Sequence, residues 1–268
     1  MKRQLYILFL IGICLFVSCS EEEELAKKYF KHYWKDKSGN VVQLDLNKDN
    51  LTDLNFISKF KKLEILAITG ETLKDISPLN QLSELKNISL YNLYEIERIP
   101  SLNGMIKLDE LYIDHTKKLK DISGIGSIPD LTELSIMSDT LEDILPIQDL
   151  KTLKILYLSC DRLSDITAIG ELTVLERLEI TYSKELVDIS PIGRLKNLKS
   201  LNLEGCNKVN NLNPLVNCDS LVKISLFQTK VDKKSLLYLV EHLKSIKTVE
   251  GSGMIDEINK IRPDIQWY

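Results

Sequence analysis

Two groupings of side chains in this sequence have residue types that can catalyse reactions. His115 and Cys160 would form a thiolate–imidazole pair, in which the imidazole takes the thiol proton and the thiolate attacks a substrate. Glu110 and Glu133 would form a carboxylate pair like those that cleave glycosidic bonds by acid and nucleophilic catalysis. Each pair works only if the fold holds its members a few ångströms apart, so the elements that carry these residues decide the matter.

Those elements belong to an internal repeat that runs through most of the chain. The pattern Leu-x-x-Leu-x-Leu returns every 22 or 23 residues. Its leading residues are Val41, Leu63, Leu85, Leu108, Leu131, Leu153, Leu175, Leu198, Leu221 and Leu243. The fourth and sixth positions of each unit are apolar too, which predicts one short strand per unit with a buried face. No unit can bury its leucines alone, so stacking of the units must create the core.

Each unit returns to the next strand through a second recurring segment. Asp75-Ile76-Ser77-Pro78-Leu79 recurs as Asp188-Ile189-Ser190-Pro191-Ile192. Ser77, Ser190 and Asn213 are good N-cap residues, and each precedes a proline whose missing N–H the start of a helix tolerates. We therefore expect a short helical turn after each proline, often only 3₁₀. The 23-residue units hold one extra residue before this segment.

The repeat separates the first catalytic pair and exposes the second. His115 and Cys160 share a repeat position but lie two strands apart, about 10 Å, which is too far for a thiolate–imidazole pair. Glu110 and Glu133 share the third position of adjacent strands, so their carboxylates could approach to about 5 Å. A shallow solenoid face lacks the deep cleft of a glycosidase, so we interpret them as a solvated acidic pair. We predict no enzyme, no catalytic residue, no cofactor and no metal site.

The repeat resembles the leucine-rich-repeat family, and its Asp-Ile-x-Pro-Leu segments are most similar to those of internalin-type members. The resemblance covers about residues 41–250. It implies an α/β solenoid, a right-handed superhelix with a concave parallel β-sheet and short 3₁₀ or helical turns on the convex side. The asparagine ladder of the family, expected at the ninth position, is mostly replaced by Glu71, Leu93, Thr116, Asp139, Ser183 and Cys206. Leu93 cannot hydrogen-bond the backbone, so we expect its turn to be irregular.

The first residues are typical of an export signal and precede the repeat fold. Lys2 and Arg3 lead into an almost unbroken apolar run over residues 5–17, which is too short to cross a bilayer. The next motif, Phe16-Val17-Ser18-Cys19, resembles the lipobox of bacterial lipoproteins, although that family prefers Leu at the position of Phe16. The resemblance implies that residues 1–18 are removed and that Cys19 carries the lipid of a stable membrane anchor. A plain signal peptide cleaved nearby is the alternative.

The residues that follow Cys19 suggest where the protein is displayed. Ser20 and the four glutamates 21–24 resemble the surface-export signal of some Gram-negative lipoproteins. This resemblance implies the cell envelope, with the protein lipid-anchored on the outer-membrane surface. A solvated spacer that holds the domain off the membrane is the alternative.

Both ends of a solenoid need covers. Leu25, Tyr29 and Tyr33 have the spacing of an amphipathic helix, within a segment (residues 19–40) that either caps the first strand or links it to the anchor. At the other end, residues 235–242 predict a longer helix, and Thr248 occupies a leucine position in a degenerate strand. Residues 251–268 are predicted to form the closing cap.

Composition limits the remaining classes of partner. The chain has 268 residues, of which 44% are hydrophobic and 28% charged, as in a soluble packed protein. Its net charge of -4 becomes -6 once Lys2 and Arg3 are removed, and it gives no support to nucleic-acid binding. Three cysteines, Cys160, Cys206 and Cys218, then remain in the repeats without the spacing of a disulfide framework or a zinc site. We expect a monomer that contacts the membrane through its lipid only.

In this family the third, fifth and seventh positions of each unit face outward on the concave sheet. They include a cluster of large and charged residues on consecutive strands: Tyr91, Glu110, Tyr112, Asp114, Glu133, Met137, Tyr157, Arg177 and Glu179. Exposed aromatics surrounded by charge are typical of binding hot spots, although tyrosines also occur on strands for pairing reasons alone. From Asp45 to Glu204 the outward acidic residues outnumber one basic residue, so we expect a protein ligand with a basic patch. The sequence thus predicts a recognition or adhesion module, with a periplasm-facing scaffold or inhibitor as the alternative.

Overall fold

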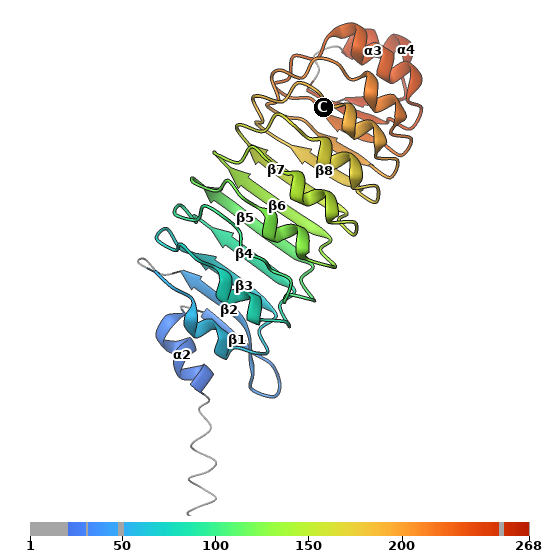
Figure 1. The fold of residues 1–268 in the computed structure, drawn as a ribbon. Helices are drawn as coiled ribbons and strands as arrows, with labels where there is room; N and C mark the ends of the chain where they lie inside the picture. The colour runs from blue at the N-terminus through green and yellow to red at the C-terminus, as the bar shows by residue number, and fades with distance from the viewer. Residues whose placement is uncertain (1–20, 31, 48–50, 252–254, 268) are drawn as a thin grey trace, which may run out of the picture.

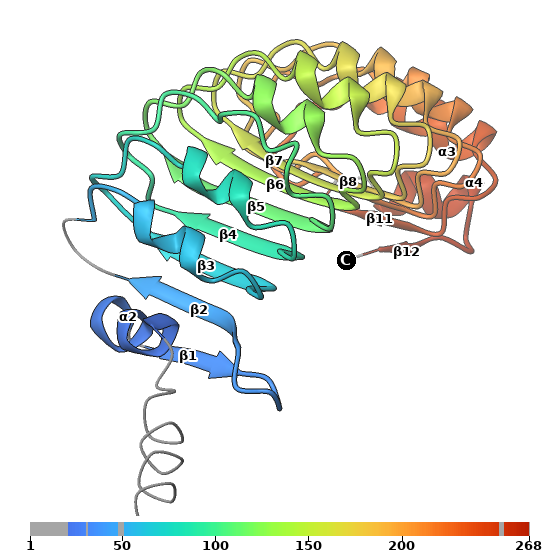
Figure 2. The same cartoon turned by 60° about the horizontal axis from the view of Figure 1, so that its bottom comes forward.

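The computed structural model describes residues 21–30, 32–47, 51–251 and 255–267, which form one curved solenoid (Figure 1). Its 12 strands make a single sheet and follow one another in chain order. They are β1 (His32–Lys35), β2 (Val41–Asn47), β3 (Ile65–Thr69), β4 (Asn87–Tyr91), β5 (Glu110–Thr116), β6 (Glu133–Ser138), β7 (Ile155–Cys160), β8 (Arg177–Ile180), β9 (Ser200–Asn202), β10 (Lys223–Ser225), β11 (Thr248–Glu250) and β12 (Gln266–Trp267). β1 is antiparallel to β2, and the pairs from β2 to β12 are parallel. The sheet lines the inside of the curve and the short helices line its outside (Figure 2).

Alternation along each strand builds the core. In β5, Leu111 and Ile113 are fully buried, whereas Glu110, Tyr112 and Asp114 face the concave side and remain partly exposed. The same alternation holds in the neighbouring strands, and each buried leucine stacks on its equivalents in the adjacent units. The predicted leucine-rich-repeat solenoid with a concave parallel sheet is confirmed.

The convex side carries one short 3₁₀ helix in most units, as predicted. These are η1 (Asn55–Lys59), η2 (Ser77–Gln81), η3 (Ser123–Ser127), η4 (Leu145–Asp149), η5 (Thr167–Glu171), η6 (Ser190–Arg194) and η7 (Asn213–Asn217). The predicted capping role of Ser77, Ser190 and Asn213 is wrong. The backbone N–H of Ser77 instead donates to the carboxylate of Asp75 at 2.8 Å, and the Ser77 hydroxyl donates to the same group at 2.7 Å.

This aspartate-based turn recurs before η3 to η6 through Asp121, Asp143, Asp165 and Asp188. In the unit that starts at Leu85 the equivalent residue is Arg98, which cannot accept the hydrogen bond, and residues 99–105 do not form a 3₁₀ helix. The altered path brings this unit close to Gly124 of the next one. A Cβ atom on Gly124 would lie 1.9 Å from the carbonyl oxygen of Pro100, so only glycine fits there.

The extra residue of the 23-residue units lies at the eighth position in a left-handed conformation. Its φ is +56° at Asn92, +58° at His115, +53° at Tyr182 and +74° at Gly205, and Gln228, the eighth residue of the unit that starts at Leu221, has the same conformation with a φ of +57°. Because each of these units absorbs its extra residue here, the strands before and the helices after it stay in register. Asn92, directly before Leu93, has the same left-handed φ as its equivalents, so the expected irregularity does not appear in this angle.

The extra residue at the eighth position also changes which residues form the buried ladder. In 22-residue units the buried ladder position is the eighth, as the pairing of Thr116 with Ser138 and of Ser138 with Cys160 shows. The ninth residues Glu71 and Asp139 are exposed and do not belong to the ladder. The ladder therefore comprises Gly70, Leu93, Thr116, Ser138, Cys160, Ser183 and Cys206. Cys206 Sγ donates to the carbonyl of Ile180 at 3.2 Å, so a thiol replaces the amide of the family's asparagine here.

Helix α2 (Glu21–Tyr29) and strand β1 cover the N-terminal end of the core. Ala26 and Phe30 are buried, and the ring of Tyr29 stacks on Phe56 with a centroid distance of 4.2 Å. Tyr33 does not continue the helix, as its spacing had suggested, because it lies in β1 opposite Leu44. Residues 1–20, which include the apolar run and Cys19, lie outside the described residues.

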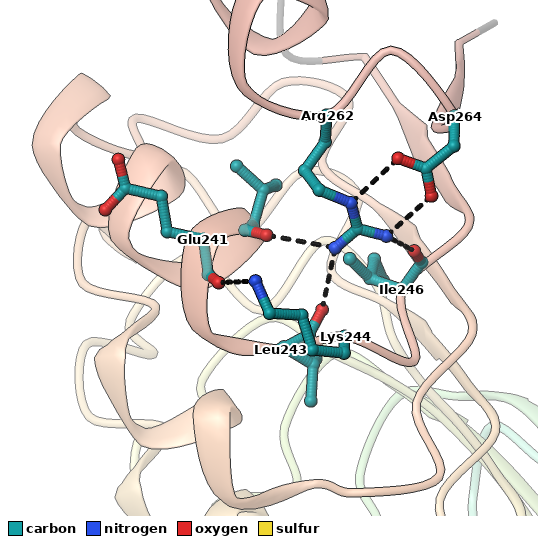
Figure 3. Close-up of polar contacts among 7 residues, drawn as sticks. Glu241, Leu243, Lys244, Ile246, Arg262 and Asp264 are labelled. Carbon is teal, nitrogen blue, oxygen red and sulfur yellow. Dashed lines mark hydrogen bonds and ion pairs between the residues drawn. The ribbon is translucent and has the colours of Figure 1, made fainter.

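The C-terminal end is closed by α3 (Lys233–His242), α4 (Ile255–Ile261) and β12. The longer α3 replaces a 3₁₀ helix and lengthens its unit, so Ile246, and not Leu243, takes the leading position. Thr248 accordingly faces outward opposite Lys223 and does not occupy a leucine position. The guanidinium of Arg262 donates to the carbonyls of Val240, Leu243 and Ile246 at 3.1–3.4 Å and to Asp264 at 2.8 Å (Figure 3). None of the described helices is long and apolar enough to span a membrane.

Candidate functional site on the concave face

Strands β4 to β8 bring the nine residues singled out in the sequence onto one face. Opposite each other in the sheet lie Tyr91 and Asp114, Glu110 and Glu133, Ile155 and Arg177, and Tyr157 and Glu179. Tyr112 and Tyr157 both pair with Ser135, so they lie two strands apart, about 10 Å. Tyr91 and Met137 are the most open of the large apolar members, with 37% of each exposed.

The centre of the face is a tyrosine flanked by two glutamates. The Tyr112 hydroxyl donates to Glu133 Oε1 at 2.6 Å and lies 3.2 Å from Glu110 Oε2. Burial of the ring, followed by the hydrogen bond to Glu133 and the charges of both glutamates, raises the pKa of Tyr112 well above its ordinary value. The hydroxyl is therefore neutral and acts as a hydrogen-bond donor at physiological pH. We call Glu110, Tyr112, Glu133 and the adjacent Asp114 the acidic tyrosine cluster.

Asp114 adds a third carboxylate to this cluster. It lies in β5 on the same side as Tyr112, and Ser135 Oγ donates to its Oδ1 at 3.3 Å. Burial raises the pKa of Asp114, while the hydrogen bond from Ser135 and the nearby His115 oppose the shift. The carboxylate is thus partly desolvated, and its charge reaches farther than that of a fully hydrated group.

A second group, of Tyr157, Arg177 and Glu179, lies beside the cluster. Arg177 Nε donates to Glu179 Oε1 at 2.9 Å, and the guanidinium carbon lies 5.3 Å from the centre of the Tyr157 ring. The hydrogen bond to Glu179 raises the pKa of Arg177. This arginine stays charged, stacks over the tyrosine and is neutralised by its own glutamate.

Many charged side chains on the rims of the solenoid form ion pairs between neighbouring units. Acidic side chains of one unit pair with basic side chains of the next, as in Glu64–Lys86, Glu95–Lys118 and Glu176–Lys199 at 2.6–2.9 Å. Among the described residues, no such ion pair involves Glu110, Asp114 or Glu133. These three carboxylates of the acidic tyrosine cluster thus have no ion-pair partner among the described residues.

The concave face extends onto elements that sequence reasoning assigned elsewhere. His32 and Trp34 lie in β1 opposite Asp45 and Gln43, and 48% of Trp34 is exposed. Ile65 is 40% exposed on the other side of Gln43, so an apolar patch lies at the N-terminal end of the same face. The alternation in His32-Tyr33-Trp34-Lys35 was the signal of this strand, but the helical spacing of Tyr29 and Tyr33 obscured it.

The thiolate–imidazole pair considered from the sequence does not form. Cys160 is buried and lies at the ladder position of Thr116, and not at that of His115 as the repeat numbering had suggested. Burial raises the pKa of the Cys160 thiol to about 12, which keeps it protonated. His115 is exposed and occupies the left-handed eighth position. Among the described residues, no group of three or more His, Cys, Asp or Glu side chains is arranged to hold a metal ion.

Comparison with known proteins identifies the fold alone. No protein-family model and no curated protein sequence matches the chain. An internalin (inlF) from Listeria monocytogenes is similar in structure, with a TM-score of 0.60 and 18% identity over 87% of this chain and 84% of that one. The internalin C2 (inlC2) from the same organism has a TM-score of 0.56 and 20% identity, over 78% of this chain and 80% of that one.

A third similar structure is that of TLR13 in a complex with ssRNA13. Its TM-score is 0.54 and its identity is 16%, over 79% of this chain but only 40% of the receptor. Together these structures establish an internalin-like leucine-rich-repeat fold, in which the chain under study carries its own set of concave side chains.

Proposed function

We propose that this protein is a lipid-anchored recognition or adhesion module that binds a protein partner on its concave face. The observation that carries the proposal is the group of partly exposed tyrosines and unpaired carboxylates on β4 to β7. Exposed aromatic side chains lose little conformational entropy on binding and provide large contact areas, which makes them typical anchors of interfaces. Many charges of the surrounding rims form ion pairs with each other, so the rims would act as an energetically minor border.

The charge of the face favours a basic protein over a nucleic acid. Phosphate groups would meet Glu110, Asp114 and Glu133, whereas nucleic-acid sites need a basic excess. TLR13 shows that this fold has been seen with RNA in another protein. In the present chain the concave charge is of the wrong sign for that ligand, and it would speed the encounter with a positively charged protein instead.

We expect the tyrosines to set the lifetime of the complex. Tyr112→Ala or Tyr157→Ala should weaken binding of the partner by about 2 kcal/mol or more, mainly through faster dissociation. Surface plasmon resonance with a partner isolated by affinity capture measures this, and Gln81→Ala on the convex side serves as the control. If the convex variant loses binding while the tyrosine variants keep it, the concave face is not the interface.

The glutamates should act on association. The double variant Glu110→Lys, Glu133→Lys reverses the local charge, so we expect it to slow association and to reverse its dependence on salt concentration. The same resonance experiment at two salt concentrations tests this. An association rate that is unchanged at low salt would contradict electrostatic steering by this face.

For the membrane anchor we expect Cys19 to carry lipid. The support is the sequence resemblance of residues 16–19 to a lipobox, since these residues lie outside the described structure. When cells are grown with a radioactive fatty acid, the wild-type protein should become labelled. The variant Cys19→Ala should lose both the label and membrane association. Label that persists in the variant would contradict lipidation.

The proposed location is the outer-membrane surface of a Gram-negative cell, and the alternative is a scaffold or inhibitor that faces the periplasm. Protease treatment of intact cells distinguishes them, because only a surface-displayed solenoid is accessible to the enzyme. Protection until the outer membrane is permeabilised would favour the periplasmic alternative.

A further inference from the structure

The two glutamates of the acidic tyrosine cluster lie opposite each other in the sheet. Among the paired residues of the described strands, Glu110 and Glu133 are the one pair of like charges. Like charges that are directly opposed on neighbouring strands destabilise a sheet. The rims of the same protein place opposite charges at neighbouring positions, so this pair departs from the pattern of the rest of the molecule.

The side chain between the two glutamates cannot satisfy both of them. The Tyr112 hydroxyl has one proton, which it donates to Glu133 at 2.6 Å, and Glu110 lies farther away at 3.2 Å. Asp114 adds a third negative charge, whose donor is the neutral hydroxyl of Ser135. Two carboxylates thus share the single proton of Tyr112, a third beside them accepts from Ser135, and none of the three has a cation within ion-pair distance among the described residues.

A neighbouring group on the same face contains the cation that is missing here. Arg177, in β8, occupies the third position of its repeat unit and lies over Tyr157, which holds the fifth position of its unit in β7. Glu133, in β6, occupies the third position of its unit, and Tyr112, in β5, holds the fifth position of its unit. Glu133 is therefore placed relative to Tyr112 as Arg177 is placed relative to Tyr157, but with the opposite charge.

We propose that the acidic tyrosine cluster binds an arginine side chain of the protein partner. The inference rests on the proposed function of the concave face and names the group that this face recognises. A guanidinium suits the site because its planar set of N–H donors can serve Glu110 and Glu133 together while its face stacks on a tyrosine ring. Arg177 interacts with Glu133 only electrostatically and from two strands away, because its hydrogen bonds hold it at Glu179, so it does not occupy the place between Glu110 and Glu133. A lysine ammonium would satisfy the charge but not the planar geometry.

A capped peptide of four arginines separated by glycines is a suitable probe, with otherwise identical lysine and citrulline peptides for comparison. Citrulline keeps the shape of arginine and removes its charge. Isothermal titration of the purified protein at low salt should rank the peptides arginine, lysine, citrulline. The variant Glu110→Gln, Glu133→Gln should bind the arginine peptide about tenfold more weakly or worse, as expected for the loss of charge-assisted hydrogen bonds. The matched control is Asp45→Asn, Glu204→Gln, which removes two charges from the same face and should have a much smaller effect.

Thermal unfolding of the same variants tests whether the pair has a structural role instead. Because Glu110→Gln, Glu133→Gln relieves repulsion, we expect an unchanged or higher melting temperature. A clear fall would show that the pair stabilises the sheet and would overturn the proposal. So would equal losses of binding in the two double variants, or lysine binding as tightly as arginine.

The outcomes also separate this inference from the proposed function. If the arginine peptide fails to bind but a partner protein still loses affinity for Tyr157→Ala, only the arginine site is wrong. If that partner binds all concave variants like the wild type, the concave face is not the interface and both proposals fall.

Discussion

Leu134→Ala should lower the free energy of unfolding by about 2–5 kcal/mol. Leu134 is fully buried in β6, between Leu111 of β5 and Leu156 of β7. Truncation removes buried apolar surface and leaves a cavity, into which the neighbouring units cannot collapse because their own leucines hold them in register. Each unit contacts only its neighbours, so a defect in a central unit weakens two interfaces at once.

Urea unfolding followed by circular dichroism measures this effect. The exposed convex residue Gln81 provides the control, and Gln81→Ala should stay within about 0.5 kcal/mol of the wild type. If Leu134→Ala changed the free energy of unfolding as little as Gln81→Ala, this leucine would not pack as the structure shows.

Arg262→Ala should destabilise the C-terminal cap by about 3 kcal/mol, because it removes the guanidinium donor from the carbonyl oxygens of Val240, Leu243 and Ile246. The side chain of Arg262 is only 13% exposed. Its guanidinium donates to carbonyl oxygens at the end of α3 and before β11, and also to the carboxylate of Asp264. Arg262→Lys should lose most of the same stability, since an ammonium group cannot span these acceptors in a planar fork. The exposed pair of Arg194 with Glu171 is the control, and Arg194→Ala should change stability by less than about 1 kcal/mol.

Hydrogen exchange of the α3 and α4 amides, together with urea unfolding, provides the measurement. The pair with Asp264 adds a dependence on pH, because Arg262 holds the pKa of that carboxyl down to about 2. Its ordinary value is 3.8, so the stabilisation by this pair is complete above about pH 4 and is lost as the pH falls toward 2. If the α3 amides of Arg262→Lys exchanged as slowly as those of the wild type, a positive charge would be sufficient and the planar guanidinium would not be needed.

The strands and the concave side chains could be predicted from the sequence because burial imposes a strict pattern on them. An apolar residue at the wrong position of a strand would face water, so the spacing of leucines such as Leu111 and Leu134 fixes which neighbours point outward. The spacing of the leucines therefore predicts that Tyr112 and Glu133 lie on the same face. Their hydrogen bond was not foreseen, because it depends on rotamers that the spacing does not determine.

Polar and terminal features were harder to predict for the opposite reason. Serine, asparagine and aspartate all satisfy the start of a helix, so Ser77 was chosen as the cap where Asp75 accepts the hydrogen bond. At the C-terminal end, Leu243 and Ile246 are both apolar, and only the length of α3 determines which of them leads the strand. Trp34 was missed because a segment of a few residues can match helical and strand spacing at once.

The left-handed residue at the eighth position has a consequence for how such a chain changes during evolution. The residue at this position is added or omitted without moving the strand before it or the helix after it. Units of different length therefore pair their strands in the same register. Insertions and deletions at this point alter one rim of the solenoid while the concave side chains keep their neighbours. The length of the loop and the side chains of the concave face can therefore change independently. The loop can be remodelled while the recognition surface is preserved, and the surface residues can be substituted while the loop stays constant.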